Sequence, residues 1–506
     1  MKRTLLATAL LLCAAAAFGG FVIHNEDCTA FFCSFGFSAD EAGARKYLAQ
    51  HLEAGSDSVK IMMLNTQGQK YMRPAWTLFE RDEQGQFSYK GKPINGTLNT
   101  MYNRMRSMSE AGVDVWRVWI AQCREAGVSP WISLRMNDVH GADEEDSYMM
   151  YELWRQHHEY WLNTYYPKFD WFARQLDYAH PEVRKYYMDI VAELLERYDC
   201  DGIELDFMRF GHVFRYGHEI EDAHFLTEFV REARRRCDEK AKAVGHKVGL
   251  AVRVPADPRD AHDRGFDVET WLDEGLVDIL TPTVFWSTNW DDVPVHIWRR
   301  IVRGRALLAV GIEGRSCPPG LREAVNCYAP SGEPFANALV NLYYARGADA
   351  VYTFNCFRDN RKFYRELADP VTVAAMRRRM LMTCSDCRRA GSQNERALPA
   401  TVGGSMHTQL RLSIGTKPEP GRAARLIIGS KQPFPDGNLP EARLNGVPLS
   451  AAQAPDPAEY TQELQQLCAY AIPDGTLTTD GNVIELHWSH AGSITVNWVE
   501  IDIAAK

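Results

Sequence analysis

Two acidic side chains alternate with apolar ones in the stretch CDGIELDFMRF, which covers residues 200–210. Glu204 and Asp206 alternate with Ile203 and Leu205, which is the period of a β-strand with one apolar and one polar face. An ionised carboxylate is costly to bury without a partner. The stretch therefore predicts a strand that directs two acids into a polar pocket, where they could perform acid–base chemistry.

A catalytic carboxylate pair needs a second acid from another strand. Residues i and i+2 of one strand lie ~6.6–7 Å apart and point the same way, so they cannot flank a bond. Glu313, in AVGIEGR, is the first choice because Gly311 and Gly314 leave room around it for a substrate. Asp257 and Asp138, near the ends of two other predicted strands, are the reserves.

The two acids of the strand have different predicted roles. Asp206 lies nearer the strand end, so it is the better nucleophile or charge stabiliser. Glu204 lies one layer deeper, and we expect it to pair with Arg253 or Arg135, which would lower its pKa. Alternatively, either acid is only a structural ion-pair partner. Glu313 could likewise be a solvent-exposed loop acid beside Arg315.

Polar and aromatic side chains near the other strand ends are candidates for substrate binding. Aromatic faces and planar polar groups at such positions suit a sugar ring and its hydroxyls. A single tryptophan could instead pack at the rim, and Asp138 with His140 could hold a divalent cation. We expect no metal and no cofactor. The binding candidates are Arg135, Asn137, Asp138, His140, Tyr178, Arg253, Asp257, Trp286, Trp290, Asn355 and Arg358.

Eight apolar runs rich in β-formers must position these side chains. Helical patterns lie between most of them, which predicts parallel strands buried on both faces. Eight such units indicate a (β/α)8 barrel, in which the carboxyl ends of the strands form the active-site face. The predicted strands are 21–27, 59–67, 130–138, 202–209, 248–257, 277–286, 307–315 and 350–357, and the predicted helices are 39–53, 98–125, 181–198, 219–243 and 334–346.

The segment between the third and fourth predicted strands is long and rich in aromatic residues. It includes SYMMYELWRQHHEYWLNTYYPKFDWF, residues 147–172. This composition is compatible with a helical excursion that packs its own small core. It is equally compatible with a lid or rim wall over the barrel mouth.

The pattern changes after the barrel. We expect a barrel domain over 20–383, a turn-rich linker over 384–400, and several strands without helical periodicity over 401–506. Such strands favour a β-sandwich. The predicted fold class is thus α/β, a (β/α)8 barrel followed by an all-β accessory domain.

The first residues, MKRTLLATALLLCAAAAFGG, are typical of a secretory signal peptide, with cleavage near Ala17 or Gly19. This apolar run does not favour stable membrane insertion. We expect export to the periplasm or the extracellular space. Eleven cysteines would then remain of twelve, and Cys28 with Cys33, or Cys317 with Cys327, are close enough in sequence to pair.

The charge of the chain excludes one class of partner. The formal net charge is −9, and no lysine- or arginine-rich stretch offsets it, so nucleic-acid binding has no electrostatic basis. The oligomeric state cannot be inferred from these patterns.

The block QLDYAHPEVRKYYMDIVAELLERYDCDGIELDFMRF, residues 175–210, resembles a recurrent motif of glycosyl-hydrolase-like family 10. That resemblance implies an exported bacterial barrel protein associated with glycans. Glu204 and Phe207 depart from the family pattern, which often has a histidine and a second aspartate there, so a sibling family fits equally well. The run GNVIELHWSHAGSITVNWVEIDI also resembles the last strands of galactose-binding-like sandwiches.

The same strand resembles the chitinase signature DGIDLDWE, whose last glutamate is the proton donor. Met208 stands at that donor position here, and methionine cannot donate a proton. The resemblances therefore imply a glycoside hydrolase with a different acid, acting on a polysaccharide or oligosaccharide. The alternative is a glycan-binding protein that has kept the barrel and lost catalysis. Projection of Glu313 into the mouth near Asp206 would favour the enzyme.

Overall fold

The computed structural model describes most of the chain. Residues 1–18 of the expected signal peptide and most of the expected linker lie outside the described residues, as do Trp286 and Arg358 of the candidate site. The described ranges are 19–34, 36–66, 78–163, 170–208, 210–284, 288–356, 360–384, 397–404 and 407–506.

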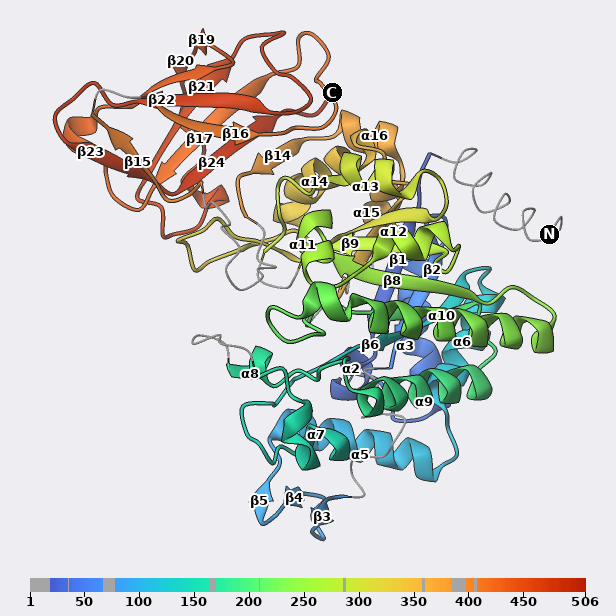
Figure 1. The fold of residues 1–506 in the computed structure, drawn as a ribbon. Coiled ribbons are helices and arrows are strands. Elements are labelled where there is room, and N and C mark those ends of the chain that lie inside the picture. The colour runs from blue at the N-terminus through green and yellow to red at the C-terminus, as the bar shows by residue number, and fades with distance from the viewer. Residues whose placement is uncertain are drawn as a thin grey trace.

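Eight parallel strands form a closed barrel in which consecutive barrel strands are neighbours (Figure 1). This arrangement confirms the predicted barrel, and each strand overlaps its predicted range. The strands are β1 (Val22–Asp27), β2 (Val59–Asn65), β6 (Ser129–Arg135), β7 (Gly202–Asp206), β8 (Gly249–Pro255), β9 (Ile279–Thr283), β10 (Leu307–Ile312) and β13 (Ala350–Phe354).

A tryptophan fills the barrel interior next to two glycines. A Cβ atom on Gly202 or Gly249 would lie 2.3 Å from a ring carbon of Trp131. The glycine of the DGIELD motif is therefore required for packing, since any side chain there would collide with the indole. The acids that follow it on β7 occupy higher layers of the interior.

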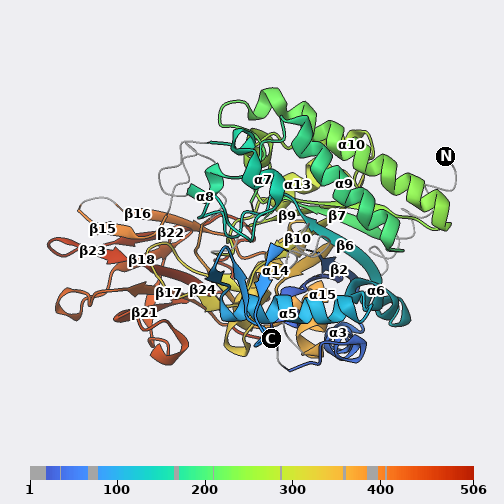
Figure 2. The ribbon, with the colours of Figure 1, turned by 90° about the horizontal axis from the view of Figure 1, so that it is seen from below.

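Helices surround the barrel (Figures 1 and 2). The predicted helix over 98–125 is two helices, because Gly112 has a left-handed φ of 73° and Asp114 caps the second one. The helices are α2 (Thr29–Cys33), α3 (Glu41–Gly55), α5 (Gly96–Glu110), α6 (Val115–Glu125), α7 (Glu152–Gln156), α8 (Asp170–Ala173), α9 (Pro181–Arg197), α10 (Glu219–Val244), α11 (Pro258–Asp263), α12 (Val268–Asp273), α13 (Val295–Val302), α14 (Glu333–Ala345), α15 (Arg361–Ala368) and α16 (Pro370–Ala375).

The aromatic segment between β6 and β7 packs against itself. The rings of Trp154 and Trp161 are 4.6 Å apart, and the Trp154 indole donates a hydrogen bond to the Arg174 carbonyl oxygen at 2.6 Å. Both tryptophans are buried. Both rings nevertheless belong to the large apolar core that the barrel shares with its helices, so the expected separate small core is wrong for the described residues of this segment.

Small antiparallel sheets accompany the barrel. One forms in the β2–β6 connection, and a hairpin follows β10. Their strands are β3 (Glu80–Arg81), β4 (Phe87–Tyr89), β5 (Lys92–Pro93), β11 (Arg315–Ser316) and β12 (Val325–Asn326).

The C-terminal part contains antiparallel sheets of five, four and two strands, as the sandwich prediction requires. Its five-stranded sheet has the order β14-β24-β17-β21-β20 and so includes β14, which lies before the expected linker. The strands are β14 (Arg378–Leu381), β15 (Ala400–Gly403), β16 (Thr408–Leu412), β17 (Ala424–Ser430), β18 (Glu441–Leu444), β19 (Val447–Pro448), β20 (Ser450–Ala452), β21 (Gln466–Ile472), β22 (Asn482–His487), β23 (Ser493–Val496) and β24 (Trp498–Ile503).

Arg346, just after α14, connects the barrel to the C-terminal sheets. Its side chain is 4% exposed and lies 2.7 Å from Asp480 of the sandwich and 2.6 Å from Asp292 of the barrel. It also donates to the Val293 carbonyl oxygen at 2.7 Å. One buried guanidinium group thus binds both parts of the chain.

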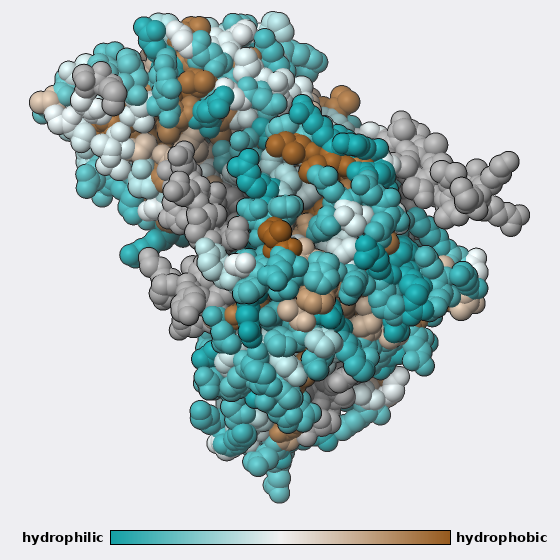
Figure 3. Space-filling view, viewed as in Figure 1, coloured by the Kyte–Doolittle hydropathy of each residue, from teal (hydrophilic) through white to brown (hydrophobic). Residues whose placement is uncertain are grey.

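The surface seen in Figure 3 is mainly hydrophilic, with small separate apolar patches. Within the ranges that the structure describes, no helix is both long and apolar enough to cross a membrane. Cys28, Cys33, Cys317 and Cys327 are all free thiols. The two disulfides that sequence proximity allows are therefore not formed.

Candidate active site

Strand β7 directs its two acids into the barrel. Ile203 and Leu205 are buried in the large apolar core that the barrel shares with its helices. Glu204 and Asp206, on the opposite face of the strand, are 0% and 1% exposed. The alternation in the sequence therefore predicted the orientation of this strand correctly.

Asp206 forms a buried ion pair with Arg253 of the neighbouring strand β8. The two residues are directly paired in register, and Arg253 Nη1 lies 2.8 Å from Asp206 Oδ2 with neither side chain exposed. The other oxygen, Oδ1, accepts a hydrogen bond from the Met208 amide at 2.9 Å. Both oxygens of Asp206 are thus occupied by the protein.

The Arg253 guanidinium group also reaches Glu313. Its Nη2 lies 3.8 Å from Glu313 Oε1, and its centre lies 4.5 Å from the Phe354 ring centroid. Because one planar guanidinium contacts both acids, the contacting oxygens of Asp206 and Glu313 are at most about 9 Å apart. Burial acts to lower the pKa of Arg253, but attraction to Asp206 and other acids outweighs it and raises that pKa.

Glu313 is placed at the barrel mouth by a buried asparagine. Asn289 accepts a hydrogen bond from the Glu313 amide at 2.8 Å and donates one to its carbonyl oxygen at 2.7 Å. The Glu313 side chain is 11% exposed, whereas that of Asp206 is fully buried. Glu313 is therefore the more accessible acid of the pair.

Of the two glycines beside Glu313, Gly314 lines a cavity, whereas Gly311 leaves no space for a substrate, contrary to expectation. A Cβ on Gly311 would lie 2.1 Å from the Thr283 hydroxyl, and one on Gly314 would lie 3.0 Å from the Tyr328 ring. The Thr283 side chain occupies the space at Gly311, so this glycine is needed for packing around the strand end.

Glu204 lies below this pair and has an unusual pKa. Burial, together with the charge of Asp206, raises its pKa to about 7. The Tyr352 hydroxyl donates a hydrogen bond to Glu204 Oε2 at 2.9 Å and itself accepts one from Asn25 at 2.6 Å. The expected ion pair and lowered pKa of Glu204 are wrong, because Arg253 pairs with Asp206 instead.

A second ion cluster is centred on Arg135, whose Nη2 lies 3.0 Å from Asp27 and whose Nη1 lies 3.5 Å from Asp138. The His140 ring contacts Asp138 at 2.6 Å. Sequence reasoning missed Asp27, although it ends the first predicted strand. Within the described part of the chain, no metal-binding group of three or more ligands includes Asp138 or His140.

Two candidate residues have structural roles. The Asn137 side chain donates to the carbonyl oxygens of Leu176 and His212 and accepts from the Leu176 amide, so its amide group is fully used. Tyr178 is completely buried and stacks on Tyr187 at 5.4 Å. Asn137 and Tyr178 were expected to bind substrate, but both side chains instead pack within the protein.

Asp257 caps helix α11. Its carboxylate accepts a hydrogen bond from the Arg259 amide at 2.8 Å. A carboxylate held at a helix N-terminus is a common stabilising arrangement. The capping role explains why an acid stands at this position, so Asp257 is a weaker candidate for a catalytic acid.

Asn355 lies at a cavity next to Glu313. The cavity has a volume of about 570 Å³ and is lined by the hairpin after β10, by Tyr328 and by Asn355. Asn355 has a left-handed φ of 52°, and its buried side-chain oxygen accepts no hydrogen bond within the described residues. Trp290 is half-buried and packs against the large core.

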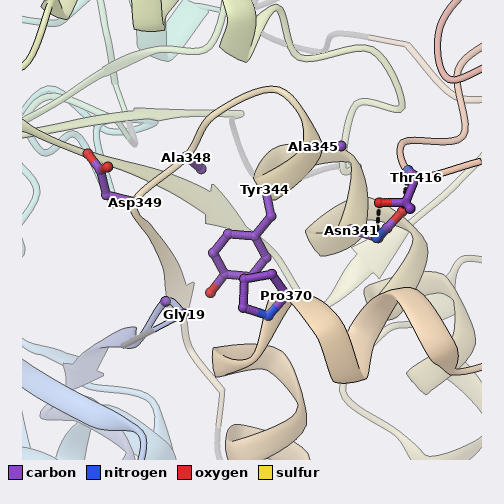
Figure 4. A pocket seen from close by; sticks show the side chains of 9 residues that line it. Gly19, Asn341, Tyr344, Ala345, Ala348, Asp349, Pro370 and Thr416 are labelled. Carbon is purple, nitrogen blue, oxygen red and sulfur yellow. Dashed lines mark hydrogen bonds between the residues drawn. The ribbon is translucent and has the colours of Figure 1, made fainter. Parts of the chain in front are cut away.

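A second cavity lies at the opposite end of the barrel. It has a volume of about 320 Å³, and Gly19, Tyr344, Asp349 and Pro370 are among its lining residues (Figure 4). Gly19 and Asp349 precede strands β1 and β13. Because chemistry in this fold takes place at the carboxyl ends of the strands, this cavity is not the candidate active site.

No family model and no curated protein matches this chain. Among solved structures, it is similar to an endo-β-1,4-mannanase from Thermotoga petrophila, with 11% identity, 96% of this chain and 97% of that chain covered, and a TM-score of 0.40. It is also similar to a chitinase from Chromobacterium violaceum, with 11% identity, 70% and 99% coverage, and a TM-score of 0.35.

A third similar structure is a glycoside hydrolase family 18 N-acetylglucosaminidase from Paenibacillus barengoltzii. It has 10% identity, 68% and 99% coverage, and a TM-score of 0.35. These similarities are too distant to assign a function. The functional argument depends on the residues at the barrel mouth.

Proposed function

We propose that this protein is an exported glycoside hydrolase that cleaves a polysaccharide or oligosaccharide with Glu313 and Asp206 as its carboxylates. The main support is the shared contact of both acids with Arg253 at the carboxyl ends of the barrel strands. Carboxyl groups that flank a glycosidic bond lie ~5–5.5 Å apart for retention and ~6.5–9.5 Å apart for inversion. The limit of about 9 Å set by Arg253 is compatible with either outcome.

Glu313 and Asp206 differ in exposure, and we assign them different roles for this reason. Glu313, the accessible one, donates a proton to the glycosidic oxygen as the bond to the anomeric carbon breaks. Asp206, paired with Arg253, stabilises the positive charge that develops on the sugar ring. Water then adds to the anomeric carbon and returns a proton to Glu313. The paired oxygens of Asp206 favour charge stabilisation over nucleophilic attack.

The cavity beside Glu313 supports a carbohydrate as the substrate. Asn326, Asn355 and Arg315 offer polar side chains there, and Tyr328 offers an aromatic one. Sugar sites combine such groups, because hydroxyls need directional hydrogen bonds and ring faces need apolar contact.

The test compares wild type with Glu313→Gln and Asp206→Asn on polysaccharides and aryl glycosides. Glu269→Gln, which changes an exposed acid on α12, is the matched control. We expect Glu313→Gln to lower kcat ~100-fold or more while the protein stays folded, since one general acid contributes ~10²–10⁴-fold. Unchanged kcat in Glu313→Gln would disprove its assigned role.

One observation favours a second candidate function, a glycan-binding protein on a barrel that has lost catalysis. Both oxygens of Asp206 are engaged by the protein, and Met208 stands where the chitinase signature has its donor. This candidate predicts glycan binding by wild type without release of sugar. It also predicts that Glu313→Gln leaves binding unchanged.

A further inference from the structure

Two histidines and one glutamate come together outside the candidate active site. His24 and Glu26 belong to β1, and His51 belongs to α3. One ring nitrogen of each histidine and one oxygen of Glu26 all lie within 4.8 Å of one another. His24 and Glu26 alternate with the inward residues Ile23 and Asn25, so the cluster lies between the barrel and its helices.

All three side chains are buried. Glu26 is 0% exposed, His24 is 2% exposed and His51 is 6% exposed. A cluster with so little solvent contact needs a compensating charge, because an isolated buried carboxylate is costly.

The distances between the side chains do not match direct ion pairs. Glu26 Oε2 lies 3.5 Å from His51 Nε2 and 3.7 Å from His24 Nε2, whereas charge-assisted N–H···O bonds are ~2.7–2.9 Å. Ligands bound to zinc at ~2.0–2.2 Å in a tetrahedron are about 3.3–3.6 Å apart. The Glu26–His51 distance falls in this range and the Glu26–His24 distance lies 0.1 Å beyond it, so a metal ion would need only a small adjustment of the side chains.

Hydrogen bonds around the cluster orient the ligand atoms. Thr353 Oγ1 contacts both His24 Nδ1, at 3.1 Å, and the Ile23 carbonyl oxygen, at 3.5 Å. A protonated His24 Nδ1 that donates to this hydroxyl would leave a lone pair on Nε2, which is the side that faces Glu26.

A hydrogen bond also orients the carboxylate of Glu26. Its Oε1 accepts a hydrogen bond from the Tyr47 hydroxyl at 2.5 Å. Its Oε2 accepts no hydrogen bond within the described residues and faces the two histidines. Outer hydrogen bonds of this kind, to a threonine and a tyrosine, usually support metal-bound histidines and carboxylates.

We propose that His24, Glu26 and His51 form a buried site for a divalent transition-metal ion, with a donor set suited to Zn²⁺, which joins strand β1 to helix α3. Two histidine nitrogens and one carboxylate oxygen form a common zinc-binding set. The site lies apart from the Asp206, Arg253 and Glu313 group, so the inference does not depend on the proposed hydrolase activity.

The first experiment measures zinc binding to the full-length protein after removal of metal with a chelator. We expect one tightly bound Zn²⁺ per chain and a thermal transition that rises by several degrees when Zn²⁺ is added. Glu26→Gln and His51→Gln should lose this ion. His262→Gln, which changes an exposed histidine on α11, is the matched control and should keep it.

Two further measurements keep the result decisive if those variants fold poorly. Thr353→Val removes only the outer hydrogen bond and should weaken zinc affinity ~10–100-fold. X-ray absorption at the zinc edge of the wild type should show nitrogen and oxygen ligands with imidazole scattering. A sulfur-bound zinc, zinc retained by His51→Gln, or no zinc in the wild type would each overturn the proposal.

Discussion

Asp206 and Arg253 form a fully buried ion pair, 2.8 Å long, between neighbouring strands of the barrel. Neither side chain has exposed surface, so each depends on the other to compensate its loss of hydration. Glu313 adds a longer contact on the open side of the same guanidinium group. The three side chains thus form one charged group at the mouth of the barrel.

Arg253→Met should destabilise the protein by ~3–5 kcal/mol, because it leaves the Asp206 carboxylate buried without its partner. The double variant Arg253→Met with Asp206→Leu should recover much of this loss, since no charge then remains buried. Chemical denaturation of the single and double variants measures both effects. Additive losses in the double variant would contradict the coupling.

Glu204 should make the stability depend on pH. Its pKa is raised from 4.5 to about 7 in the folded protein, so the folded state binds its proton more tightly. The contribution is complete below pH 4.5 and is lost as the pH rises to about 7, a fall on the order of 3 kcal/mol. Denaturation curves of wild type and Glu204→Gln should diverge over this range, and parallel curves would refute the shift.

Asn289→Ala should reduce both stability and activity. It leaves the Glu313 amide and carbonyl without their partner, at a cost of ~1–3 kcal/mol, and releases the backbone that positions the proposed acid. The effect on activity should appear in kcat. Ser316→Ala, which removes a 3.3 Å contact to the Asn289 amide and a 3.2 Å contact to the Cys327 sulfur, is the control and should have a smaller effect. Equal kcat in wild type and Asn289→Ala would argue against a positioning role.

Arg346→Ala should uncouple the barrel from the C-terminal sheets. The loss is expected to be on the order of 1–2 kcal/mol, because both aspartate partners are more than half exposed. Calorimetry should then resolve two unfolding transitions for Arg346→Ala. Wild type should unfold more cooperatively than this variant. Arg300→Ala, an exposed arginine on α13, should leave the transition unchanged.

The sequence was sufficient to predict the barrel and the inward acids of β7. Ile203 and Leu205 alternate with Glu204 and Asp206, and a two-residue period determines which side chains share a face of a strand. The partner of Arg253 was not predictable in the same way. It depends on the register between β7 and β8, which places Arg253 directly beside Asp206.

Long-range partners explain the other differences. Asn137 looked like a substrate ligand because it follows a strand, but its amide binds backbone groups at Leu176 and His212, far along the chain. Glu26 lies in a predicted strand and His51 in a predicted helix, and only the fold brings them together. Spacing in the sequence carries no signal for such pairs.

The order of strands in the C-terminal sheet has a consequence for protein synthesis. Strand β24 is translated after β14 and β17, yet it lies between them in the finished sheet. Strand β14 therefore waits, with an unpaired edge, while more than a hundred later residues are translated. Any chain interrupted before β24 would leave that edge exposed.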